Sequence, residues 1–151
     1  HSGSAIPTSN RIAGTANSTN YAVAIATPSG GGYSFQSQGG FNLNANTGTG
    51  SAQQQWVVIA NKLGPLTAGS TFACQVQNTG SSNTDTKLEF TAGGNMYSST
   101  AGGRCLITLT NVTFDVNGVA SVEGTFVAEL YTFKRDLAPL IINDGVFRWV
   151  K

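Results

Sequence analysis

Few residues in this chain of 151 could carry catalytic chemistry, and their spacing does not fit a known catalytic arrangement well. His1 is the only histidine and no Gly-x-Ser-x-Gly segment occurs, so a Ser–His–Asp triad lacks its base. Glu123 and Glu129 share one face of a strand-like run, but their separation along a strand is about 20 Å. Glycosidase carboxylates lie about 5–10 Å apart. A cross-strand pair such as Glu129 with Asp144 stays open. We predict a chain that is not an enzyme, with an acidic-residue hydrolase as the less favoured alternative.

Metal ligands are equally sparse. A closed zinc site needs four ligands, and the chain has one histidine and two cysteines. Segments 115–117 and 143–144 carry Asp and Asn oxygens, but neither matches the twelve-residue calcium loop. Tight turns use the same residue types for backbone reasons. We predict no metal and no cofactor.

The cysteines, Cys74 and Cys105, are the only two. In a chain that resembles exported proteins in composition, they predict one disulfide, and two buried free thiols are the alternative. Closing a loop of this length would contribute about 3–4 kcal/mol in the chain-entropy model.

Charge is scarce throughout the chain. Charged residues make up 10%, against roughly 25% in ordinary soluble proteins. Such a low content is typical of secreted and cell-surface β-proteins. The net charge is only +1, and the sequence contains no basic patch that would attract nucleic acid. No run approaches the ~18 apolar residues of a membrane helix. We predict a secreted, periplasmic or cell-surface location and no membrane span.

Residues 1–4 (His-Ser-Gly-Ser) resemble the remnant of a tag and linker. No basic and apolar leader follows them. Residues 5–151 have the length of a single domain with a real core.

Hydrophobic alternation predicts an all-β fold. Short alternating runs end at turn residues such as Asn117-Gly118. We predict a two-sheet antiparallel β-sandwich of about eight or nine strands, with a closed β-barrel as the alternative. The predicted strands cover residues 21–27, 33–38, 41–44, 54–61, 70–77, 87–91, 104–115, 120–133 and 140–150. In the second-last of these, one apolar face should point to the core: Val122, Gly124, Phe126, Ala128 and Leu130.

Sugar sites combine an exposed aromatic ring with amide side chains, and the chain contains both. Trp56 lies within an apolar run and is predicted to be a core residue. Tyr97, in a glycine-rich stretch, is the aromatic most expected at the surface, whereas Phe147 and Trp149 share a face that could be core or exposed. The predicted ligand-binding residues are Tyr33, Asn95, Tyr97 and Trp149.

Two short motifs near the C-terminus carry a resemblance. Gly124-Thr125-Phe126 and the segment 143–147 (Asn-Asp-Gly-Val-Phe) resemble the final strands of a bacterial exported β-sandwich family, the DUF6252-like domains, which are often lipoproteins. Asn143 departs from the family's usual Thr, and segment 66–72 matches a turn that precedes a middle strand. The resemblance covers residues 56–149 in patches. It implies export, a sandwich fold and a precursor that could carry a lipid anchor, and it implies no activity.

These observations together favour a non-catalytic, exported binding or structural module at a bacterial cell surface or in the periplasm. A carbohydrate-binding, lectin-like domain is the sharper alternative. The expected partners are a glycan or a cell-envelope protein.

Overall fold

A computed structural model of the chain describes residues 9–25, 40–61, 66–74, 86–116 and 118–150. The strands and 3-10 turns of these ranges are β1 (Arg11–Ala16), β2 (Thr19–Ala24), β3 (Gly40–Thr47), η1 (Gly50–Ala52), β4 (Gln54–Asn61), β5 (Thr71–Ala73), β6 (Lys87–Ala92), β7 (Asn95–Ser98), η2 (Ser99–Ala101), β8 (Arg104–Asp115), β9 (Gly118–Leu130) and β10 (Leu140–Val150).

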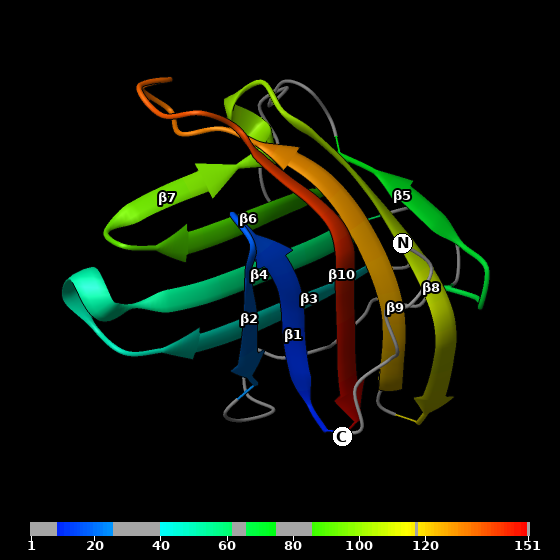
Figure 1. The fold of residues 1–151 in the computed structure, drawn as a ribbon. Coiled ribbons are helices and arrows are strands. Elements are labelled where there is room, and N and C mark those ends of the chain that lie inside the picture. The colour runs from blue at the N-terminus through cyan, green and yellow to red at the C-terminus, as the bar shows by residue number, and fades with distance from the viewer. Residues whose placement is uncertain (1–8, 26–39, 62–65, 75–85, 117, 151) are drawn as a thin grey trace.

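The strands form two antiparallel sheets, one of six strands in the order β2-β1-β10-β9-β8-β5 and one of four in the order β3-β4-β6-β7. Figure 1 shows the two layers with their strands running in different directions. One hydrophobic core contains residues from both sheets. The predicted two-sheet sandwich is confirmed. The described residues contain ten strands, close to the expected eight or nine, and the predicted strand at 33–38 lies outside these residues.

Two of these strands, β1 and β7, were not expected from the sequence. Each is joined to its neighbour by a two-residue turn with positive φ at both positions, Asn17 and Ser18 (51° and 68°) in one and Gly93 and Gly94 (61° and 81°) in the other. Such turns match the twist of a hairpin. The alternation in β1 is weak because Ala13 and Gly14 are buried on consecutive positions, so its pattern does not resemble that of a half-exposed strand.

Strand β1 pairs with β10, so the first and last described strands are neighbours. Beyond the ladder, the Asn10 side chain donates to the Val150 carbonyl at 2.8 Å and accepts from the Val150 N–H at 2.9 Å. At the other end, Asp144 accepts hydrogen bonds from the backbone N–H and hydroxyl of Thr15 at 2.8 and 2.6 Å. Side chains therefore close both ends of the β1–β10 pair.

Two glycines and two phenylalanines pair reciprocally between β9 and β10. Gly124 lies opposite Phe147, and Gly145 lies opposite Phe126. A Cβ on Gly124 would lie 2.5 Å from the Phe147 ring, and one on Gly145 would lie 2.2 Å from the Phe126 ring. Each glycine thus makes room for the ring on the next strand, which explains the glycine and phenylalanine positions of the motifs 124–126 and 143–147.

Trp56 of β4 connects the two sheets at the centre of the core and is fully buried, as predicted. Its ring lies 4.3 Å from Phe90 and 5.5 Å from Phe126, measured between centroids. Its indole N–H donates to the Tyr21 carbonyl at 3.0 Å, so the one polar group of this side chain is satisfied inside the core.

The disulfide between Cys74 and Cys105 joins the residue after β5 to the start of β8, with 4.9 Å between the two Cα atoms. This confirms the predicted pairing. The chain between the two cysteines contains β6 and β7, which belong to the other sheet. The bond therefore closes a loop that leaves the six-stranded sheet and returns to it.

Ser18 adopts a φ of 68°, a conformation that costs an ordinary L-residue about 1–2 kcal/mol and glycine far less. Ser18→Gly should raise the free energy of unfolding by roughly 0.5–1 kcal/mol. This net gain already subtracts the larger conformational entropy that glycine loses on folding. Urea denaturation measures this change. Thr19→Gly, one residue later in the extended strand β2, is the matched control and should lower stability. A Ser18→Gly variant no more stable than the wild type would contradict the turn assignment.

Gly124→Ala should destabilise the fold by about 1–3 kcal/mol, as overpacked cores do. The added methyl would meet the Phe147 ring at 2.5 Å and the Thr108 carbonyl oxygen at 2.4 Å, and a backbone oxygen cannot rotate away. The midpoint of thermal or urea unfolding reports the loss. Thr125→Ala, at the next position on the opposite face of β9, should change stability by less than about 1 kcal/mol. Equal effects of the two variants would contradict the reciprocal pairing.

Candidate functional site

The structure places three of the four predicted ligand-binding residues, and two of them are buried. Tyr97 is 9% exposed and Trp149 is 3% exposed. The prediction that Tyr97 is a surface aromatic is wrong, because Gly93 and Gly94 form a tight turn and Tyr97 lies on the inner face of β7, opposite Phe90. Neither buried ring can stack on a sugar.

The question left open for Phe147 and Trp149 is also answered. Both face the core, and Arg148 between them lies on the outer face of the sheet. Asn95 is exposed beside the β6–β7 turn, where its side chain donates to the Gly93 carbonyl at 3.4 Å. Tyr33 lies outside the described residues.

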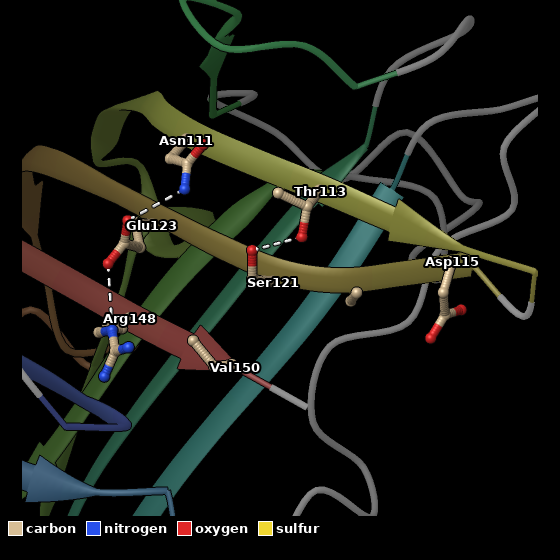
Figure 2. Close-up of a pocket in the computed structure, with 8 residues that line it drawn as sticks. Asn111, Thr113, Asp115, Ser121, Glu123, Arg148 and Val150 are labelled. Atoms are coloured by element: carbon tan, nitrogen blue, oxygen red, sulfur yellow. Dashed lines mark hydrogen bonds and ion pairs between the residues drawn. The ribbon is translucent and has the colours of Figure 1, made fainter.

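A shallow polar groove of about 510 Å³ lies on the outer face of the six-stranded sheet. Strand register creates it, because Asn111 of β8 lies opposite Glu123 of β9, and Glu123 lies opposite Arg148 of β10. Figure 2 shows these side chains on adjacent strands, with Glu123 in the middle. The lining residues are Asn111, Thr113, Asp115, Ala120, Ser121, Glu123, Arg148 and Val150.

Glu123 holds the polar groups of the groove in place. One of its oxygens accepts from Arg148 Nε at 3.1 Å, and the other accepts from the Asn111 amide at 3.3 Å. Thr113 and Ser121 share a hydrogen bond of 2.7 Å between their hydroxyls. The Glu123–Arg148 pair is part-exposed and so contributes about 0–1 kcal/mol to stability. Its main effect is to fix the direction of donors and acceptors across three strands.

The side chains of the groove are arranged to form hydrogen bonds with a ligand. Glu123 and Asp115 both line it, but Asp115 is four positions beyond the residue opposite Glu123, about 13 Å along the strand. Such a separation exceeds the spacing of glycosidase pairs. Across the described ranges, no three His, Cys, Asp or Glu residues gather as metal ligands would.

Farther along the same sheet face lies a small aliphatic patch, formed by Leu106, Val127 and Ile141. Leu106 and Val127 are direct partners across β8 and β9. All three side chains are exposed by two fifths to one half.

A charged cluster borders the patch around Glu129. Arg104 Nε donates to one Glu129 oxygen at 3.1 Å, and the Tyr131 hydroxyl donates to the other. The Arg135 guanidinium lies 3.9 Å from the centre of the Tyr131 ring, within the range of a cation–π contact.

Glu123 and Glu129 share one face of β9, as predicted, and this is the face away from the core, where each forms an ion pair with an arginine. The sequence did not reveal these pairs, because each joins residues 25 positions apart. Only the cross-strand register brings the partners together. One signal was available in the sequence: neighbouring predicted strands carry an Arg and a Glu that a suitable register would bring opposite each other.

The hydrogen bond from Tyr131 is the main cause that lowers the pKa of Glu129, and Arg104 acts in the same direction. The same bond raises the pKa of Tyr131. The ionised Glu129 carboxylate therefore stabilises the folded state fully at pH values above 4.5, the usual pKa of a glutamate. This stabilisation is lost as the pH falls through the lower pKa that Glu129 has in the folded state. That of Tyr131 is present below pH 10.0 and is lost as pH rises through its raised pKa.

No protein-family model, curated protein or solved structure matches this chain. The resemblance to exported β-sandwich domains therefore stays a prediction. Within the residues that the structure describes, no helix has the length and apolarity needed to cross a bilayer.

Tyr131→Phe should raise the pKa of Glu129 toward its usual value, because the hydroxyl that stabilises the carboxylate is removed while the ring under Arg135 is kept. Titration of the Glu129 carboxyl carbon by NMR measures the change. Arg104→Gln should raise the same pKa as well, since Arg104 lowers it through its charge and through a hydrogen bond. A Glu129 titration that is unchanged in Tyr131→Phe would refute this assignment.

Proposed function

We propose that this chain is a non-catalytic binding module that acts at a bacterial cell surface or in the periplasm, and that its outer-sheet groove binds a glycan. The observation that carries the proposal is the groove itself. Its lining offers an amide, two hydroxyls, a carboxylate and a guanidinium on neighbouring strands, from Asn111, Thr113, Ser121, Glu123 and Arg148.

These groups match what sugar hydroxyls require, since each hydroxyl both donates and accepts hydrogen bonds. The contacts between Glu123 and its two neighbours hold the groups before any ligand arrives. Preorganisation of this kind reduces the entropy lost on binding. None of the described residues that line the groove is aromatic, so recognition would depend on hydrogen bonds, and a modest affinity is expected.

The disulfide supports a location outside the cytoplasm, because such bonds form and persist in oxidising compartments. The low content of charged residues, 10%, is in keeping with the same location. A lipid anchor on the precursor would follow from the family resemblance and is part of the proposal on that ground alone.

An assembly role, with a cell-envelope protein as the partner, is the second candidate. The aliphatic patch of Leu106, Val127 and Ile141 favours it, because these side chains lie exposed on a sheet face. The groove offers a wider set of hydrogen-bonding groups than this patch, so glycan binding ranks first.

Asn111→Ala should weaken glycan binding about 10-fold, the loss expected when one well-placed hydrogen bond is removed. A glycan array identifies the bound sugar, and titration calorimetry measures the affinity. Asn44→Ala is the matched control, because Asn44 is an exposed amide of β3 in the other sheet, bonded to Gln55 at 3.1 Å.

Equal losses in the two asparagine variants would place binding elsewhere than in the groove. A wild-type chain that binds no printed glycan but self-associates in sedimentation experiments would favour the assembly role instead.

A further inference from the structure

Arg11 extends the row of polar side chains beyond the groove. It lies directly opposite Arg148 in the β1–β10 pair, and directly opposite residues of an antiparallel pair share a face, with Cβ atoms about 4.5–5.5 Å apart. Four neighbouring strands therefore present one continuous row on the outer face, in the order Asn111, Glu123, Arg148 and Arg11.

The charges of this row do not balance. Glu123 forms an ion pair with Arg148 at 3.1 Å, whereas Arg11 belongs to none of the ion pairs seen between described residues. Arg11 Nε instead donates to the Ser9 hydroxyl at 2.8 Å. Within this row two guanidinium groups accompany one carboxylate, and the second carboxylate of the groove, Asp115, lies at its far end. Like charges directly opposite each other destabilise a sheet, so this arrangement costs stability in the absence of an anion.

The described neighbours of Arg11 on the edge strand β2 have small side chains. Its partner on the other side is Ala24 of β2, and both Ala22 and Ala24 are exposed small side chains on that edge strand. Of the described residues, those opposite and beside Arg11 on β2 are small, which favours a ligand that continues from the groove over Arg148 toward Arg11.

We propose that Arg11 and Arg148 together bind an anionic substituent, a carboxylate or a sulfate ester, of an acidic glycan whose neutral hydroxyls occupy the groove. This inference rests on the proposed function and adds the chemical class of the ligand. The planar guanidinium presents two parallel N–H donors that match the oxygens of such groups. An anion between the two arginines would also remove their mutual repulsion.

The test compares oligogalacturonates, sulfated dextran oligomers and neutral dextran oligomers of matched length, each titrated into the wild type and into Arg11→Gln. Acidic oligomers should bind the wild type, and Arg11→Gln should weaken that binding roughly 10-fold or more, as loss of a charge-assisted hydrogen bond does. Carboxylated and sulfated oligomers distinguish the two anions.

Arg104→Gln is the matched control, because it removes the same charge from the same sheet face. Arg104 is highly exposed and paired with Glu129, away from the groove, so its loss should change binding less than about 2-fold at 0.15 M salt, where exposed charges are screened. Equal losses in Arg11→Gln and Arg104→Gln would overturn the subsite, since they would reveal only general charge attraction.

Stability gives a second readout. Arg11→Gln removes a like-charge contact and should keep or raise the urea midpoint, whereas Arg148→Gln removes the partner of Glu123 and should lower it. A large destabilisation by Arg11→Gln would assign Arg11 a structural role and overturn the proposal. Neutral oligomers that bind as tightly as acidic ones, with Asn111 needed and Arg11 dispensable, would overturn the anion subsite but leave the proposed function intact. No binding to any oligomer or printed glycan would overturn both.

Discussion

The reciprocal packing of glycine against phenylalanine between β9 and β10 is the constraint on which the rest of this structure depends. Gly124 accommodates the ring of Phe147, and Gly145 accommodates the ring of Phe126. Both rings are fully buried. A slip of one residue would turn every side chain of a strand to the other face and would press each ring against a residue with a Cβ. The two pairs therefore permit one register at the centre of the six-stranded sheet.

The polar outer face follows from the same register. Because Phe147 pairs with Gly124, the next residues along, Arg148 and Glu123, pair on the other side of the sheet. Glu123 can then reach Asn111 of β8 as well. The core thus determines where the groove lies, although no core atom contributes to its surface. A site built across three strands in this way keeps its geometry without depending on loops.

The sequence was informative where a pattern is local. Alternation in residues 122–130 predicted which side chains of β9 face the core, and two cysteines predicted one disulfide. It failed for β1 and β7, which are short and lack clear alternation. Tyr97 was misassigned because a pair of glycines can mark either a loop or a tight hairpin turn. The groove could not be predicted, because its pairs depend on register between strands far apart in the chain.

The pairing of β1 with β10 has a mechanical consequence. The ladder begins at Arg11 on one strand and ends near Val150 on the other, so tension applied to the chain at these two positions would pull on the same end of the pair. Hydrogen bonds would then break one after another, beginning with the two between Asn10 and Val150. A chain arranged in this way should open at low force, and the disulfide would limit its extension by keeping residues 74–105 closed. Single-molecule stretching would show a first unfolding event at low force. The total increase in chain length would then fall short of that of the full chain, because the disulfide-closed loop cannot extend.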